Sequence, residues 1–218
     1  MRFALTMVAL SVALVSFGFG LTASAADNVA PEGFTALFNG KDFAGWQAAR
    51  GGKPESDEAR AKWQPHWKVE DGVIQFDGQG PDLWTNAKFK DFVLLVDWRL
   101  PRPGDSGIYL RGQGKSQVNI WCNAMGSGEV WGYRTDQAQP EEVRAACTPL
   151  KNADRPVGEW NTFKVTMKGD RLNVELNGEL VIRDAQLPGV PPEGEIALQR
   201  HGDPVEFKNI FVKELPAQ

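Results

Sequence analysis

Apolar and polar residues alternate with a period of two in many short segments of this chain. Such alternation is typical of β-strands that bury one face and expose the other. The longest of these segments covers residues 92–100, and residues 106–111 and 117–122 follow it at intervals that suit turns. Roughly a dozen short strands at this spacing predict an all-β fold, a jelly-roll sandwich of two antiparallel sheets.

Turn residues separate the predicted strands. Asp71-Gly72 and Asn177-Gly178 are dipeptides of the kind that close tight hairpins. Longer polar or proline-containing stretches are predicted as loops, at residues 47–64, 126–154 and 187–192. Helical turns are predicted within the first two of them, at residues 57–63 and 140–146. Because long loops of compact domains commonly carry binding residues, the second loop is the predicted functional one.

The composition narrows the class of protein. The chain has 218 residues, of which 23 are glycine, 14 are proline and only 2 are cysteine. These numbers exclude a collagen-like chain and a disulfide scaffold, and they favour one domain rich in turns. With 24 Lys and Arg against 28 Asp and Glu, the net charge is −4. The chain therefore lacks the basic excess that binding to nucleic acid requires.

The first 25 residues differ from the rest of the chain. Arg2 is their only charged residue, an apolar run follows it, and Ala23-Ser24-Ala25 fits a cleavage site. We predict a cleaved secretory signal at residues 1–25 and a single mature domain at 26–218, in the periplasm or outside the cell. An uncleaved anchor is the alternative, and the mature chain has no further membrane span. In the periplasm or outside the cell, the two cysteines could form a disulfide or remain free thiols.

Alternation also assigns side chains to the two faces of each strand. In the strands near residues 106–111, 117–122 and 195–201, aliphatic residues share one face, and ring, amide and guanidinium groups share the other. Such groups suit bidentate and stacking contacts with a polyhydroxylated ligand, whereas an ordinary solvated face is the alternative. The residues assigned to this polar face are Tyr109, Arg111, Gln117, Asn119, Trp121, Gln199 and His201.

Three titratable side chains are candidates for acid–base chemistry. His201 stands at the end of a predicted strand, from where it can reach over a sheet. Glu129 in the long loop and Asp97 in the longest strand supply carboxylates. The alternative for these carboxylates is an ion pair, with Arg134 and Arg99 respectively. The closely spaced carboxylates of a single-strand retaining glycosidase are missing, so sugar chemistry here needs another route.

Several ordered segments of the mature chain carry a family resemblance. They are residues 33–42 (GFTALFNGKD), 45–46, 67–74, 83–85, 106–112 (SGIYLRG), 158–161, 176–178, 196–202 (IALQRHG) and 205–210. Together these segments resemble the 3-keto-disaccharide hydrolase family. The resemblance implies a concanavalin-like jelly roll in an exported enzyme that cleaves glycosides already oxidised at C3 of the sugar.

The resemblance also implies a reaction. A C3 ketone acidifies the C2 hydrogen, so that a base removes it, an enolate forms, and the C1 aglycone leaves before water adds. This route needs a base, a group that stabilises the enolate and an acid for the leaving group. One departure from the family pattern is that Gln117 and Cys122 stand where many members have carboxylates. Glu129 is the candidate that replaces them.

These observations lead to the hypothesis of a 3-keto-glycoside hydrolase or lyase, with a non-catalytic carbohydrate-binding module as the alternative. The predicted catalytic residues are His201 or Glu129 as the base, Arg111 at the enolate oxygen, and Asp97. The predicted substrate-binding residues are Arg99, Tyr109, Gln117, Asn119, Trp121, Tyr133, Arg134 and Gln199. The sequence leaves open whether a divalent metal such as calcium is a cofactor. Beside the sugar substrate, a sugar 3-oxidoreductase is a candidate partner.

Overall fold

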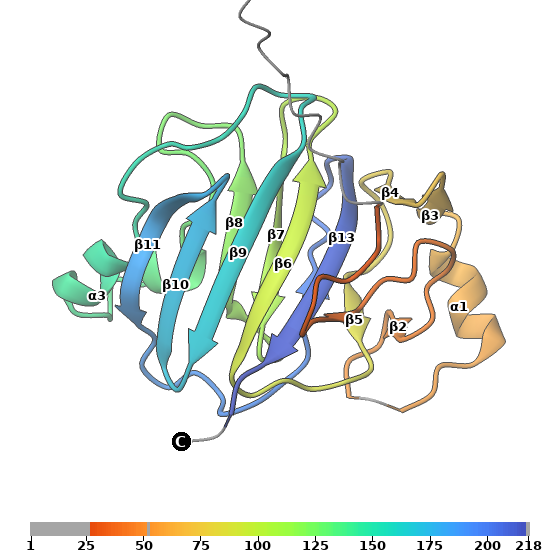
Figure 1. Cartoon of the computed structure of the whole chain (residues 1–218), viewed down its shortest axis with the longest axis horizontal. Coiled ribbons are helices and arrows are strands. Elements are labelled where there is room, and N and C mark those ends of the chain that lie inside the picture. The colour runs from red at the N-terminus through yellow and green to blue at the C-terminus, as the bar shows by residue number, and fades with distance from the viewer. Residues whose placement is uncertain (1–26, 52, 217–218) are drawn as a thin grey trace, which may run out of the picture.

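The computed structural model describes residues 27–216 except residue 52. Within that part of the chain, antiparallel sheets of eight and five strands pack against each other (Figure 1). The strand order is β11-β10-β9-β6-β13-β4-β3 in the larger sheet, with β1 on β13, and β2-β5-β12-β7-β8 in the smaller sheet. Because hairpins alternate with crossovers in this order, the predicted all-β jelly-roll sandwich is confirmed.

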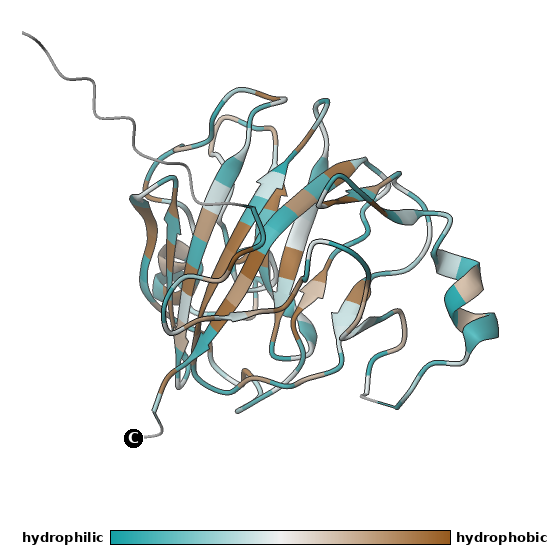
Figure 2. Cartoon of the chain, turned by 45° about the vertical axis from the view of Figure 1, so that its right-hand side comes forward, coloured by the Kyte–Doolittle hydropathy of each residue, from teal (hydrophilic) through white to brown (hydrophobic). Residues whose placement is uncertain are grey.

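The larger sheet is built from strands whose burial alternates from residue to residue. In β6 (Phe92–Arg99) and β9 (Asn161–Lys168), every second side chain is buried. Brown hydrophobic bands accordingly alternate with paler and teal bands along the strands in Figure 2. The other strands of this sheet are β1 (Thr35–Ala36), β3 (Trp67–Glu70), β4 (Val73–Phe76), β10 (Arg171–Leu176), β11 (Glu179–Gln186) and β13 (Val205–Glu214).

The smaller sheet covers the inner face of the larger one. Its strands are β2 (Trp46–Gln47), β5 (Leu83–Thr85), β7 (Asp105–Leu110), β8 (Gln113–Trp121) and β12 (Ala197–Leu198). Ile108 and Val118 are register partners in β7 and β8, and both are fully buried. They join Leu94, Val96 and Phe163 of the larger sheet in one hydrophobic core. The opposite face of β7 and β8 is therefore the outer face of the sandwich.

The predicted hairpins form at the predicted dipeptides. Asp71 and Gly72 have φ values of 50° and 76° between β3 and β4, and Asn177 and Gly178 have 54° and 83° between β10 and β11. Positive φ at both central residues matches the right-handed twist of the flanking strands, which explains why Asp-Gly and Asn-Gly occur here.

Short helices occupy the loops. The two predicted helical turns are confirmed as α1 (Asp57–Trp63) and α3 (Glu141–Ala146). The sequence did not predict α2 (Trp131–Arg134), which lies on β8. A side chain at Gly132 would place its Cβ 2.5 Å from the backbone oxygen of Lys115, so only glycine allows this approach. The close contact holds α2 against β8, the edge strand with which the preceding residue Val130 forms a bridge at Val118.

Two sequence predictions concern termini and cysteines. The predicted signal at residues 1–25 lies outside the described residues, and no helix among the described residues is long and apolar enough to span a membrane. Cys122 is exposed, Cys147 is buried, and both thiols are free rather than joined in a disulfide. Burial raises the pKa of Cys147 to about 12, so this thiol stays protonated and inert at neutral pH.

Candidate functional site

A row of side chains crosses the outer face of the smaller sheet. Trp84 and Tyr109 are both register partners of Ala197, and Tyr109 is the partner of Gln117. Register partners in antiparallel strands point to the same face, so these residues stand side by side. The rings of Trp84 and Tyr109 lie 5.6 Å apart between centroids. Asn119, two residues beyond Gln117 on β8, continues the polar face.

Three amide side chains on this face bind one another. The Nε2 of Gln117 donates to Oδ1 of Asn119 at 2.6 Å and to Oε1 of Gln199 at 2.9 Å. The three side chains are buried, and Gln117 fits only because Gly107 beneath it has no Cβ. Buried amides with satisfied partners keep one orientation, so this group is a rigid polar floor. The structure thus brings together three residues that the sequence predicted for substrate binding.

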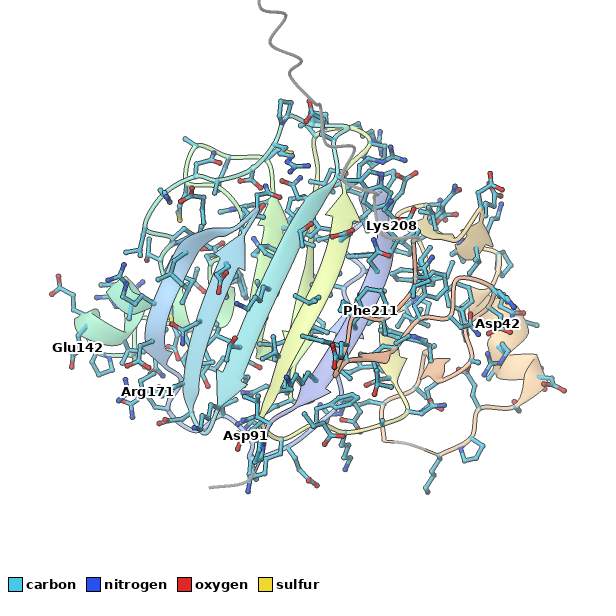
Figure 3. All side chains as sticks on the ribbon, in the orientation of Figure 1. Asp42, Asp91, Glu142, Arg171, Lys208 and Phe211 are labelled. Carbon is cyan, nitrogen blue, oxygen red and sulfur yellow. The ribbon has the colours of Figure 1, made fainter. Side chains whose placement is uncertain are left out.

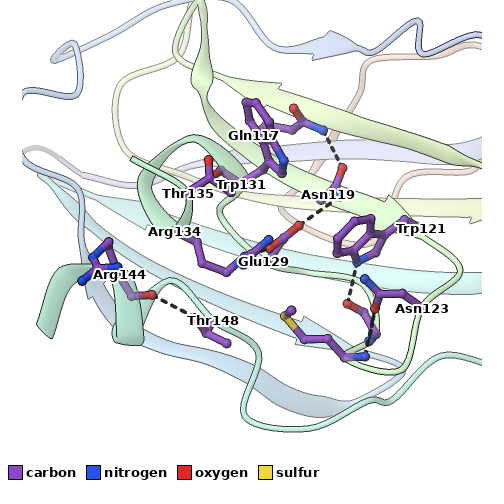
Figure 4. Close-up of polar contacts among 12 residues, drawn as sticks. Gln117, Asn119, Trp121, Asn123, Glu129, Trp131, Arg134, Thr135, Arg144 and Thr148 are labelled. Atoms are coloured by element: carbon purple, nitrogen blue, oxygen red, sulfur yellow. Dashed lines mark hydrogen bonds and ion pairs between the residues drawn. The ribbon is translucent and has the colours of Figure 1, made fainter. Parts of the chain in front are cut away.

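Glu129 lies beside Asn119, whose backbone N–H donates to the backbone oxygen of Glu129. Its Oε1 accepts a hydrogen bond from Nδ2 of Asn119 at 3.2 Å, and its Oε2 pairs with Nε of Arg134 (Figure 4). Glu129 has no exposed surface, while the side chain of Arg134 is 24% exposed. The ion pair that the sequence left as the alternative is therefore what forms. Glu129 orients Asn119 rather than facing a ligand.

A small pocket opens above the amides. It has a volume of about 130 Å³ and is lined by Asp105, Gln117, Asn119, Trp131, Gln199 and His201. Nδ1 of His201 lies 4.0 Å from Oδ1 of Asp105. The side chain of His201 is 51% exposed, and Trp131 is 47% exposed. A histidine beside a carboxylate, a fixed set of amides and an exposed aromatic ring therefore meet at one place on the sheet.

Burial sets the charge states in and around this pocket. It raises the pKa of Asp105; the nearby Asp203 raises it further, whereas His201 opposes the shift. Burial, followed by the charge of Asp82, also raises the pKa of Tyr109, whereas the neighbouring Gln199 amide opposes this shift. A raised pKa makes Asp105 a stronger base and keeps Tyr109 protonated, so the face combines proton acceptors with a neutral hydroxyl donor.

Counting the hydrogen bonds that each amide already makes shows which of its N–H groups a ligand can use. An amide nitrogen carries two hydrogens. Both on Gln117 are occupied by Asn119 and Gln199, whereas Asn119 gives one to Glu129 and Gln199 gives one to Gln117. Among the described contacts, Asn119 and Gln199 therefore each keep one N–H. These two donors can bind an oxygen of a ligand in the pocket.

The predicted position of Arg111 on this face is wrong. A bulge at the end of β7 breaks the alternation, and Arg111 has φ 51° in the turn to β8. Its buried guanidinium pairs with Asp91 at 3.0 Å and donates to the backbone oxygens of Lys90, Gly169 and Pro191. Asp91 marks this place at the lower end of the molecule in Figure 3. Arg111 therefore holds loops together away from the pocket.

Two other predicted site residues, Asp97 and Arg99, also lie elsewhere. Asp97 and Arg99 belong to β6, so their alternation is as predicted but places them on the outer face of the larger sheet. There Asp97 accepts hydrogen bonds from Thr162 and Asn209, and Arg99 pairs with Glu206. Period-two alternation identifies a face of a strand but not the sheet that the strand joins.

Tyr133 and Trp121 flank the pocket without lining it. Tyr133, a residue of α2, is fully buried, and its hydroxyl donates to the backbone oxygen of Pro188 at 3.2 Å. Trp121 donates from Nε1 to the backbone oxygen of Gly126 and lines a second, larger pocket at the end of the sandwich. Tyr133 thus connects α2 to the loop that contains Pro188.

Sequence reasoning missed Asp105 and Trp131. Asp105 has the same parity as Tyr109, so extending the predicted strand by one residue would have placed it on the polar face. No alternating pattern could have placed Trp131 on this face. It belongs to a four-residue helix within a loop whose sequence shows no periodicity.

The described residues offer no matching set of ligands for the divalent metal that the sequence left open. Within residues 27–216 without residue 52, no group of three or more His, Cys, Asp or Glu side chains could hold an ion. His201 and Asp105 supply two donors, whereas protein sites for calcium use six to eight oxygen ligands, some of them water.

The fold and the pocket together define a β-sandwich protein with a site suited to a polyhydroxylated ligand. The chain belongs to the family of 3-keto-alpha-glucoside-1,2-lyase-like domains, whose model matches residues 33–213. A protein of Bacteroides thetaiotaomicron named 3-keto-disaccharide hydrolase is similar, with 26% identity over 92% of this chain and 86% of that protein. The family resemblance seen in the sequence is confirmed.

Solved structures agree on the fold. A Parabacteroides distasonis protein, assigned provisionally as a glycosyl hydrolase, is 27% identical with a TM-score of 0.64, covering 87% of this chain and 100% of that one. The carbohydrate-binding module CBM66 of Bacillus subtilis is 18% identical with a TM-score of 0.52, covering 78% of this chain and 96% of that one. The second likeness shows the fold alone, because folds do not define activity.

Proposed function

We propose that this protein is a glycosidase-like enzyme that cleaves 3-keto-glycosides at the polar pocket of the smaller sheet. The observation that carries the proposal is the pairing of His201 with Asp105 beside two amides that keep free N–H donors. Membership of the 3-keto-alpha-glucoside-1,2-lyase-like family and the relative named 3-keto-disaccharide hydrolase support the substrate class.

The residues divide the reaction between them. His201 takes the proton from C2 of the 3-keto sugar, and Asp105 orients its ring and balances the charge that it gains. The negative charge moves to the C3 oxygen, which the N–H groups of Asn119 and Gln199 stabilise. The enolate then expels the aglycone oxygen from C1. Adding a hydroxyl to C1 and a proton to C2 completes a hydrolysis.

Two aromatic residues complete the assignment. Tyr109 is protonated at neutral pH, as tyrosines ordinarily are, and burial raises its pKa further; it donates a proton to the leaving oxygen and regains one from solvent. Trp131 is exposed at the rim of the pocket, where its indole can stack on the apolar face of a sugar ring. The backbone of α2, which carries Trp131, lies close to that of β8 at Gly132.

The proposal carries two further expectations from the sequence. A 3-keto sugar must be made by an oxidising enzyme, so a sugar 3-oxidoreductase would act before this protein. The predicted signal at residues 1–25 supports export to the periplasm or beyond. Recovery of the protein in the periplasmic or secreted fraction, beginning near Ala26 or Asp27, would support export; an uncleaved protein in the cytoplasmic fraction would contradict it.

The direct test uses isotope incorporation. The protein is incubated with a 3-keto-glucoside in deuterated water, and the released sugar is followed by NMR and mass spectrometry against an enzyme-free control. Removal of the C2 proton predicts deuterium at C2 of the product above the control. Turnover without C2 deuterium would contradict the elimination route. Saturable binding without turnover would support the carbohydrate-binding module instead.

A further inference from the structure

A second pocket lies at the end of the sandwich where β6 and β8 finish. Its volume is about 600 Å³, several times the 130 Å³ of the polar pocket. The loops after β8 and before β9 form its walls, at the top of the molecule in Figure 1. The reaction proposed above does not use it.

Apolar side chains line much of this end pocket. Trp98 comes from the buried side of β6, Leu100 directly follows that strand, and Trp121 comes from the end of β8. Pro156 and Val157 belong to the loop before β9, and Val157 is 47% exposed. Walls of this kind favour a ring with little polar surface over a second sugar with many hydroxyls.

Two residues of the lining each carry a buried polar atom that has no partner. Among the described residues, four buried side-chain nitrogen or oxygen atoms lack a hydrogen bond, and Nε1 of Trp98 and Oδ1 of Asp154 are two of them. Both residues line the end pocket. Trp98 is 2% exposed, and the other oxygen of Asp154 accepts the backbone N–H of Ser127 at 2.8 Å, which fixes the carboxylate. An unpaired buried group costs free energy until a ligand satisfies it.

These atoms define the chemistry of a ligand. An indole N–H is only a donor and a carboxylate only an acceptor, whereas a hydroxyl group accepts from the first and donates to the second. Asp154 and Glu159 are both in the lining, and Arg155, the one cation there, already donates to the backbone oxygen of Trp160. A carboxylate-bearing ligand is therefore disfavoured.

The end pocket adjoins the polar pocket. Trp121 is the register partner of Asp105, which lines the polar pocket, and the backbone N–H of Cys122 donates to the oxygen of Gly104. At about 130 Å³, the polar pocket has room for little more than one sugar ring, so the rest of a glycoside lies outside it. We propose that the end pocket binds the aglycone, an uncharged aromatic ring that carries a hydroxyl group. This inference rests on the proposed function.

Binding of a free phenol tests the pocket without catalysis. Wild-type protein is titrated by calorimetry with 4-methylphenol, with its methyl ether, which cannot donate, and with benzoate. Val157→Arg fills the mouth from an exposed position, and Leu150→Arg is the matched control, because Leu150 is 61% exposed and outside the lining. We expect 4-methylphenol to bind wild type and control alike, and Val157→Arg about tenfold more weakly. Equal binding by all three proteins, or equal binding of benzoate, would overturn the proposal.

Turnover separates this inference from the proposed function. Val157→Arg should lower kcat/KM for a hydroxyaryl 3-keto-glucoside about tenfold. The kcat/KM for methyl 3-keto-glucoside, whose aglycone is only a methyl group, should change less than about twofold. If wild type cleaves neither substrate but the phenol binds as expected, the function fails and the pocket stands. If wild type cleaves both and Val157→Arg affects them equally, the aglycone assignment is wrong.

Discussion

Glu129 and His201 occupy opposite environments near the same face. Glu129 has no exposed surface, and its carboxylate oxygens already bind Asn119 and Arg134. His201 is half-exposed and lies 4.0 Å from Asp105. A general base has to reach the proton that it removes, so His201 can act on a ligand, whereas Glu129 fixes the amide beside it.

This difference predicts a large effect of one histidine and not of the other. His201→Ala should lower kcat for a 3-keto-glucoside about a hundredfold or more, because general base catalysis is lost. His66→Ala is the matched control: His66 is the second histidine, sits in a loop and pairs with Asp77 at 2.9 Å. Steady-state kinetics on both variants decide the matter. Equal rates for His201→Ala and wild type would remove His201 from the mechanism.

At the scale of elements, the turn between β7 and β8 ties the sandwich together at the end away from the end pocket. Arg111 in this turn reaches the residue before β6, the turn between β9 and β10, and the loop after β11. Its guanidinium and the Asp91 carboxylate are both buried. Arg111 therefore acts as a structural residue.

Arg111→Met should accordingly cost stability rather than catalysis. Removing one partner of a buried ion pair leaves the other charge unpaired, which costs about 3 to 5 kcal/mol of the free energy of unfolding. Arg99→Met removes the more exposed pair with Glu206 and should cost about 1 kcal/mol or less. Denaturant unfolding measures both. A large fall in kcat of folded Arg111→Met would restore Arg111 to the site.

Period-two patterning predicted the strands, the two hairpin turns and the face that holds Gln117, Asn119 and Gln199. It failed where the backbone leaves the regular strand conformation, as at the positive φ of Arg111. It also could not assign Asp97 to the larger sheet, because sheet membership depends on partners distant in sequence.

The remaining differences come from burial and loops. Glu129 and Arg134 form a buried pair only because the loop folds back onto β8, which no local pattern encodes. Trp131 enters the pocket through α2, whose position depends on the absence of a side chain at Gly132. Such contacts depend on tertiary packing, so sequence reasoning found the amides of the site but not its rim.

At the scale of the whole molecule, buried carboxyls give stability a pH dependence. Burial raises the pKa of Asp105 and of Asp82, so the folded state favours their protonated forms. The stabilisation that comes from holding these two carboxyls protonated is therefore complete below the ordinary carboxyl pKa. It is lost as the pH rises through their raised pKa values in the folded protein. As the pH rises above about 4, the ordinary carboxyl pKa, Asp105→Asn should gain stability relative to wild type.

Asp136 provides a control of opposite sign. A hydrogen bond from Lys115 is the largest of the effects that lower its pKa to about 2. Its stabilisation is present above the ordinary carboxyl pKa and is lost as the pH falls toward about 2, so Asp136→Asn should be less stable than wild type at neutral pH. Unfolding by urea over this pH range measures both variants. The same slope for both would contradict the assigned charge environments.

An active site on the outer face of the smaller sheet makes the polar residues of that face, and not those of the larger sheet, essential for turnover. The most direct measurement compares kcat/KM for a 3-keto-glucoside in Gln117→Ala and Asp97→Asn, which change polar residues on the outer faces of the two sheets. We predict a fall of about tenfold or more for Gln117→Ala, because the amide floor loses its central donor, and less than about twofold for Asp97→Asn. The reverse order would contradict the account.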